Sequence, residues 1–208
     1  MGYLSSLFLG LLLSFLGQLP LGTISITATQ IAVQENFHNA WKYSIGIALI
    51  EMVYLRIILS GMEWTMHSRT LFSLINWFSI LFFLALGIFS LFVAYKQDPD
   101  KKALLLNNSL DRLLLGLSMS LLNPAQIPFW FFWSGYFLNQ GWLLPGFVSF
   151  NYFTLGSGLG TIGGLALFMY GGNWLVTKMK TSNRRLNQFM GILFIVMAGI
   201  QLYRMLRS

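Results

Sequence analysis

Two short polar stretches interrupt long apolar runs of this chain, and the first of them surrounds a proline. It contains Pro20, Gly22 and Thr23. Proline lacks a backbone donor and glycine allows close approach, so backbone groups near this point are left without helical partners. The free N–H groups of a helix beginning after Gly22 could bind a carboxylate. The alternative is a simple proline kink whose hydroxyls bond back to their own helix.

The second polar stretch is richer in side chains that can bind a solute. It contains Asn123, Pro124 and Gln126, followed by aromatic residues from Phe129 to Trp133. A residue before proline is driven out of the helical conformation, and a buried amide needs partners in an apolar medium. The two amides could bind a zwitterion, or Asn123 could cap the broken helix. We expect the aromatic run to face lipid or to form an interfacial belt.

One acidic residue, Glu51, lies near the middle of an apolar segment that covers residues 40–61. An ionised carboxylate is costly at that depth in a membrane unless it is paired or hydrated. Glu51 could therefore bind and release a proton during a transport cycle. The alternative is a protonated structural residue that is hydrogen-bonded between helices.

Three glycines, Gly156, Gly160 and Gly164, recur at four-residue spacing in another apolar segment. This spacing places small residues on one face of a helix, where a second helix can pack closely. We expect helix packing at this face. A sliding surface for a conformational change is the alternative.

The composition decides what kind of chain carries these residues. Of 208 residues, 56% are hydrophobic and 9% are charged, with a mean hydropathy of +0.66. Soluble domains have about a quarter charged residues. The sequence therefore predicts an all-α integral membrane protein, with room for about six segments of about twenty residues. The six apolar segments cover residues 3–33, 40–61, 71–95, 110–138, 147–170 and 186–206.

The first and fourth segments are longer than one span, and each contains a break at its proline. Each break opens a group of three segments, which predicts a duplicated chain within one membrane domain. The repeats would cover residues 1–95 and 109–208, with residues 96–108 as a cytoplasmic connector. Because three is odd, the second repeat would be inverted, and such repeats place a binding site near the membrane midplane.

The basic residues predict the orientation. The odd-numbered turns contain nine Lys and Arg residues and the even-numbered side contains three, with Arg56 inside a segment. Cytoplasmic loops are enriched in Lys and Arg. We expect the odd-numbered turns in the cytoplasm and both termini outside.

Several function classes are disfavoured. The net charge of +7 comes from residues in short turns, so we do not expect nucleic-acid binding. There is no cysteine, and His38 and His67 have no partner at ligand spacing, so we expect no metal site. No side-chain pattern of an intramembrane enzyme is present, so we expect no catalytic residues and no cofactor.

Together the two breaks resemble the lysine exporter (LysE/RhtB-type) family of amino-acid translocators. The shared features are the proline-glycine turn at Pro20 and Gly22, then Gly46 to Glu51 in the stretch Y-S-I-G-I-A-L-I-E, and the S-L-L-N-P-A-Q stretch from Ser120 to Gln126. The turn lacks the family's second proline, Glu51 replaces its usual aspartate, and Gln126 stands for its usual lysine. These departures predict a divergent member.

The resemblance implies a multi-pass protein of the bacterial inner membrane that exports amino acids or related metabolites, coupled to protons. Its partners would be the lipid bilayer, the cargo and protons, and the sequence leaves a homo-oligomer open. Two alternatives are a divalent-cation exporter of the same superfamily and a membrane scaffold that transports nothing. The first would need acidic ligands in both halves. The second would need no paired broken helices.

Overall fold

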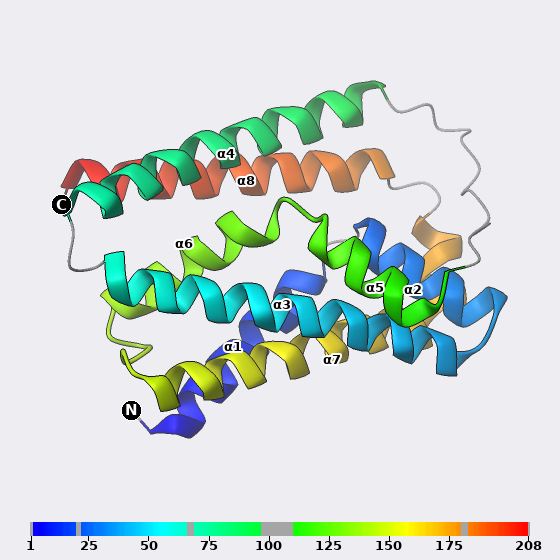
Figure 1. The fold of residues 1–208 in the computed structure, drawn as a ribbon. Helices are drawn as coiled ribbons and strands as arrows, with labels where there is room; N and C mark the ends of the chain where they lie inside the picture. The colour runs from blue at the N-terminus through cyan, green and yellow to red at the C-terminus, as the bar shows by residue number, and fades with distance from the viewer. Residues whose placement is uncertain (1, 20–21, 66–68, 97–109, 180–182, 208) are drawn as a thin grey trace.

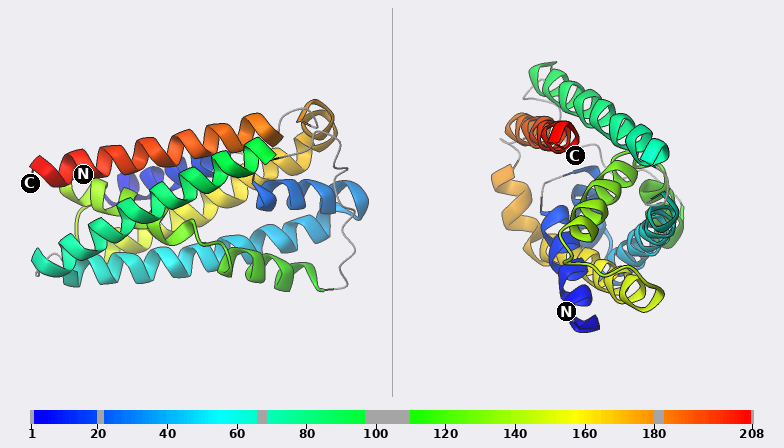
Figure 2. Two further views of the ribbon diagram at one scale, coloured as in Figure 1. Left: turned by 90° about the horizontal axis from the view of Figure 1, so that it is seen from above. Right: turned by 90° about the vertical axis from the view of Figure 1, so that its left-hand side faces the viewer.

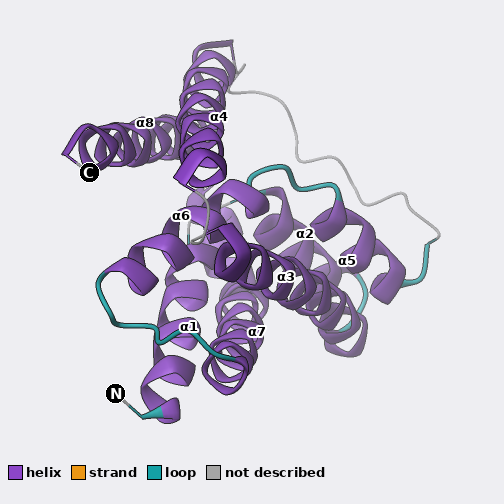
Figure 3. Ribbon diagram, turned by 60° about the vertical axis from the view of Figure 1, so that its left-hand side comes forward, coloured by secondary structure: helices purple, strands orange, loops and turns teal. Residues whose placement is uncertain are grey.

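The computed structural model describes residues 2–19, 22–65, 69–96, 110–179 and 183–207. Within these ranges it contains helices and loops and no strand, so the predicted all-α class is confirmed for the described residues (Figure 3). Pro20, His67 and connector residues 97–108 lie outside the described residues. The helices are α1 (Tyr3–Gln18), α2 (Thr23–Gln34), α3 (Phe37–Thr65), α4 (Arg69–Lys96), α5 (Arg112–Leu121), α6 (Gln126–Asn139), α7 (Phe147–Met179) and α8 (Asn183–Arg207).

The first and fourth apolar segments are each split into two helices. The second break has a local cause, because the Oδ1 of Asn123 accepts a hydrogen bond of 3.2 Å from the backbone N of Ala125. The phenolic OH of Tyr54 in α3 donates to the carbonyl of Leu121 at 2.8 Å. Such bonds satisfy backbone groups that the end of α5 leaves free.

Three helix pairs form the framework: α1 packs on α7, α5 packs on α3, and α4 packs on α8. Glycines allow the close approach in each pair. A Cβ at Gly156 of α7 would overlap the carbonyl of Leu7, and one at Gly116 of α5 would overlap the carbonyl of Tyr43. In the third pair, a Cβ at Gly87 or Gly191 would contact the other residue's carbonyl oxygen.

The helices run alternately between the two ends of the molecule, with α1–α2 and α5–α6 each counted as one broken passage (Figure 1). The start of α1 and the end of α8 lie at one end. At the opposite end lie the α2–α3 turn, the end of α4 and the start of α5. Seen end-on, α4 and α8 form a pair beside the remaining helices (Figure 2).

By length and hydropathy, two described helices qualify as membrane spans, Phe37–Met62 and Phe147–Gly171. The pair Tyr3–Gln18 and Thr23–Gln34 qualifies together as a broken span, bent by 80°. Shorter apolar helical stretches are Asn76–Phe92, Arg112–Leu121 and Gly191–Tyr203. The structure therefore has two or three span candidates among the described residues, and the six crossings stay a prediction.

The aromatic run of α6 corrects one expectation. Trp130, Phe131 and Phe132 are buried, with Trp130 only 1% exposed, so this part of the run does not face lipid. Phe132 packs edge-on against Phe83 of α4, and Phe83 stacks on Phe194 of α8. The rings therefore join the α4–α8 pair to the rest of the core.

Candidate functional site

A cavity of about 520 Å³ lies where the two breaks meet. This volume is within the usual range for small-molecule sites, about 300–1,000 Å³. The cavity is lined by the second half of α1, the first turn of α2, Glu51 of α3, Ser90 of α4, the break before α6, and one face each of α6 and α8. Residues from both halves of the chain therefore contribute to one site.

The first break contributes the beginning of α2 to the cavity wall. Gly22 is the N-cap of α2 and Thr23 is its first residue, and both line the cavity. Gly22 has no side chain that could accept a hydrogen bond from the first turn of α2. The N–H groups of a first helical turn also have no partner within the helix. Deeper in α2, Thr29 Oγ1 donates to the carbonyls of Ser25, at 3.0 Å, and Phe168, at 3.1 Å.

The second break contributes two amides to the same wall. Asn123 lines the cavity while its Oδ1 is bonded to Ala125 N, so this residue also caps the break. Gln126 is 7% exposed, and its Nε2 donates to Ser120 Oγ at 2.8 Å. Ser120 Oγ donates in turn to the carbonyl of Ile47 in α3, at 3.2 Å. Pro124 is exposed within the break.

Glu51 is 3% exposed and lies among neutral hydrogen-bonding groups. Its Oε1 accepts from Ser14 Oγ of α1 at 2.7 Å and from Ser157 Oγ of α7 at 3.3 Å. Its Oε2 accepts from Gln18 Nε2 at 3.2 Å. Both carboxyl oxygens therefore have protein partners, and the carboxyl joins α3 to α1 and α7.

Thr161 of α7 extends this network. Its Oγ1 lies 2.6 Å from Ser14 Oγ and 3.1 Å from the carbonyl of Ser157, to which it donates. The network has five contacts, but Ser14, Thr161, Ser157 and Gln18 supply only four hydrogens to them. A proton on Glu51 would supply the fifth. Glu51 could then donate to Ser14, and Ser14 could donate to Thr161.

The glycines of α7 lie beside this network. A Cβ at Gly160 would overlap the carbonyl of Leu11, and one at Gly164 would lie 2.7 Å from the Cβ of Gln18. Gly156, Gly160 and Gly164 thus form the face of α7 that contacts α1. Close contact between these helices brings Ser14 within reach of Thr161.

Sequence reasoning identified Glu51 and missed the groups around it. Ser14 was not singled out, although Ser6, Gly10 and Ser14 are the buried residues of α1 and recur at four-residue spacing. That spacing is the same small-residue signal that was recognised in α7. Ser6 Oγ and Ser149 Oγ lie 2.9 Å apart, so the two stripes also meet at the other end of the pair.

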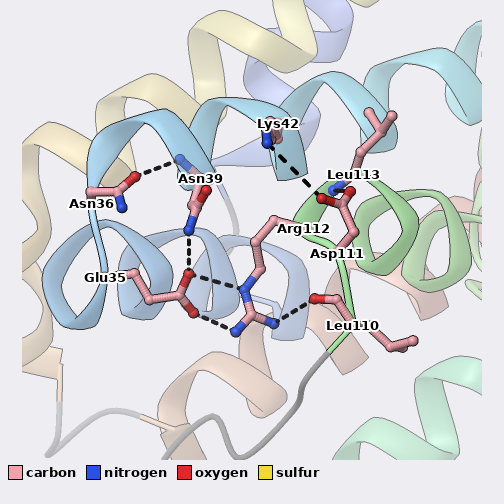
Figure 4. Close-up of polar contacts among 8 residues, drawn as sticks. All are labelled: Glu35, Asn36, Asn39, Lys42, Leu110, Asp111, Arg112 and Leu113. Carbon is pink, nitrogen blue, oxygen red and sulfur yellow. Dashed lines mark hydrogen bonds and ion pairs between the residues drawn. The ribbon is translucent and has the colours of Figure 1, made fainter.

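A second polar cluster lies away from the cavity, at the end of the molecule that contains the α2–α3 turn (Figure 4). Glu35 forms an ion pair with Arg112 and accepts from Asn39 Nδ2 at 2.8 Å. The hydrogen bond from Arg112 lowers the pKa of Glu35. Lys42 Nζ lies 4.0 Å from a carboxylate oxygen of Asp111. The cluster joins the first half of the chain to the start of α5.

The family model of the LysE type translocators matches residues 15–205, nearly the whole chain. The chain belongs to this family. It is therefore a multi-pass membrane protein of a transporter family, as the resemblance of its two breaks implied. Comparisons with curated proteins and with solved structures found no match. The matched range of this LysE type translocator includes both breaks, Glu51 and the glycine face of α7.

Proposed function

We propose that this protein exports amino acids or related small metabolites from the cytoplasm and couples export to protons. The main support is the placement of Glu51, a buried acid that lines a cavity between the two breaks and has only neutral hydrogen-bond partners. A carboxyl in such surroundings can change its charge during a cycle without breaking an ion pair.

The hydrogen count supports the proton step. When Glu51 is ionised, its neighbours supply one hydrogen too few for all the contacts around it. When Glu51 is protonated, every contact has a hydrogen. Proton binding therefore stabilises the contact of α3 with α1 and α7, and proton release weakens it. This difference can couple proton transfer to helix movement.

Cargo binding uses the two breaks. The first turn of α2 presents backbone N–H groups to the cavity, where a cargo carboxylate can accept hydrogen bonds. Asn123 and Gln126 line the opposite break. The Oε1 of Gln126 is buried without a hydrogen-bond partner, so it can accept one from a cargo ammonium after a small rotation of the amide.

The architecture behind this mechanism is a three-plus-three inverted repeat in one membrane domain, covering residues 1–95 and 109–208. The packing is reciprocal: the first helix of each half packs on the long second element of the other half, α1 on α7 and α5 on α3. The third elements, α4 and α8, pack on each other. A two-fold relation between the halves would produce this pattern.

Reporter fusions test this architecture. The turns at residues 96–112 and 178–185 should report cytoplasm, and a fusion after Ser208 should report the outside. The end of α4 and the start of α5 lie at one end of the molecule, and the start of α1 and the end of α8 lie at the other, which favours this outcome (Figure 1). A cytoplasmic C-terminus would contradict the six-span repeat and would favour five crossings.

Export can be tested before the cargo is identified. Metabolites released by cells with and without the gene are compared by untargeted mass spectrometry, and amino acids or close relatives should be enriched outside cells that carry it. Asn123→Leu should abolish this difference while the protein still inserts in the membrane. If Asn123→Leu fails to accumulate in the membrane, its bond to Ala125 N has a structural role instead.

Unchanged amino-acid release with a gene-dependent change in divalent cations would instead support a cation exporter. In the described part of the chain, no group of three or more His, Cys, Asp or Glu side chains is placed to bind a metal. The scaffold alternative predicts no gene-dependent release of any solute.

A further inference from the structure

We infer that the cargo is an amino acid with a bulky apolar side chain and no charge on that side chain. This inference rests on the amino-acid export proposed above and specifies which members of that class the site accepts. It follows from how polar and apolar groups are divided around the cavity.

Most of the polar lining belongs to α1, α2, α3 and the second break with Gln126 at the start of α6, and Ser90 of α4 adds one hydroxyl. The rest of the wall formed by α6 and α8 is apolar. Phe129, Trp130 and Trp133 line the cavity from α6, and Leu193, Phe194 and Met197 line it from α8. A zwitterion bound between the two breaks would have its side chain directed at this wall. Burial of apolar surface there stabilises the complex.

The wall belongs to the second half of the chain and is supported by α4 of the first half. Phe194 also stacks on Phe83 of α4, and Trp133 packs against Phe132 and Phe137. These contacts hold the rings in place around the cavity. A preformed apolar surface favours a side chain that fills it and disfavours a polar one that would lose its water.

A basic side chain has no free counter-ion in this cavity. Glu51 is the one ionisable residue among the described residues that line it. Its two oxygens already accept hydrogen bonds from Ser14, Ser157 and Gln18. The remaining acceptor position is on Oε2 of a side chain that is 3% exposed, so a cargo lysine would lose its water to reach it and the site disfavours lysine.

Binding to the purified full-length protein in nanodiscs tests the inference, with isothermal titration calorimetry of leucine, phenylalanine, serine and lysine. Leucine and phenylalanine should bind at least tenfold more tightly than serine, because each methylene in an apolar pocket contributes about tenfold or more. They should exceed lysine by a similar factor, because the lysine ammonium would lose its water at the apolar wall. Phe129→Ala should reduce this preference severalfold. If Phe129→Ala is not monodisperse, Leu193→Ala removes apolar surface from the facing wall and should have the same effect.

Phe8→Ala is the matched control, because Phe8 is 64% exposed on α1 and does not line the cavity. It should keep the preference of the parent. Serine or lysine binding as tightly as leucine would overturn the inference and leave amino-acid export in place. If none of the four amino acids binds to folded protein, the inference is wrong, and the metabolite-release comparison decides separately whether the proposed export stands.

Discussion

Glu35 and Glu51 are acidic residues in the same half of the chain, and the structure surrounds them in opposite ways. Glu35 is exposed just after α2 and is paired with the guanidinium of Arg112 (Figure 4). Glu51 is buried in α3, and its partners are two serines and a glutamine. Glu35 has a permanent counter-charge, and Glu51 has none among the residues that the structure describes.

The difference separates two roles that a membrane carboxylate can have. A pair such as Glu35–Arg112 stays ionised near neutral pH and links two helices, but it contributes little stability because water screens it. An acid such as Glu51, surrounded by neutral groups, is stable only while its charge is neutralised or its site is hydrated. The first arrangement favours a fixed contact, and the second favours an exchangeable proton.

The largest expected effect is on cargo accumulation and comes from Glu51→Gln, which keeps the shape of the side chain and removes the titratable group. In proteoliposomes with the cargo identified by the release comparison, this variant should exchange cargo between the two sides. It should fail to accumulate cargo when a pH gradient is imposed, with at least a tenfold loss measured by radiolabel uptake.

Glu51→Asp is the matched control, because it retains the acid and shortens its reach by one methylene. It should keep partial activity. Should Glu51→Gln accumulate cargo as well as the parent across a range of pH, Glu51 is a structural hydrogen-bonding residue and not a proton carrier.

The next largest effect is expected on thermal stability, when the close contact between α1 and α7 that holds the partners of Glu51 together is disturbed. Gly156→Ala places a Cβ against the carbonyl of Leu7 and should separate α7 from α1. Overpacking of this kind costs about 1–3 kcal/mol, so the melting temperature in detergent should fall by several degrees. Gly199→Ala is the control, since a Cβ there would meet nothing within 4 Å. An equal melting temperature for both variants would show that this contact is not limiting for stability.

Removal of the surface pair should have a smaller effect. Arg112→Gln breaks the ion pair with Glu35 and should change stability by about 1 kcal/mol or less, measured by thermal unfolding in detergent. The effect should shrink further at high salt because the pair is near the surface. A loss as large as that of Gly156→Ala would mean that the pair is an essential link between the halves.

The smallest expected effect is a pH dependence of the stability that the Glu35–Arg112 pair contributes. The pKa of Glu35 is lowered in the folded state, so its stabilising contribution is present at neutral pH and is lost as the pH falls through the acid range. The difference in melting temperature between the parent and Glu35→Gln should therefore shrink from pH 7 to pH 3. A difference that grows on acidification would contradict this assignment.

Local sequence signals predicted much of the fold. Apolar runs located the long helices, and the residues around Asn123 predicted the second break, where α5 ends and α6 begins. These features depend on neighbouring residues, so a single sequence is sufficient to find them. The aromatic residues of α6 were misplaced, because hydropathy does not distinguish a lipid-facing ring from one that packs on α4 and α8.

The site was predicted less completely because its contacts are distant in sequence. Glu51 stood out since a charge is rare in an apolar segment. Its partners did not, because serine is common in membrane helices and Ser14 is 37 residues from Glu51. Ser157 is 106 residues from Glu51 and lies beside the glycine face of α7. The pairing of α1 with α7 would have been needed to connect them.

That pairing has a consequence for how the protein is made. Ser14 and Thr161, which lie in contact in the finished molecule, are 147 residues apart in the chain. At about 5–20 residues per second, a ribosome takes roughly 7 to 30 s to synthesise that interval. During this time the serine and glycine face of α1 is in the membrane before α7 covers it. Glu51 is also synthesised before its partner Ser157. Early biogenesis therefore exposes the polar face of α1 to lipid or to the insertion machinery until α7 arrives.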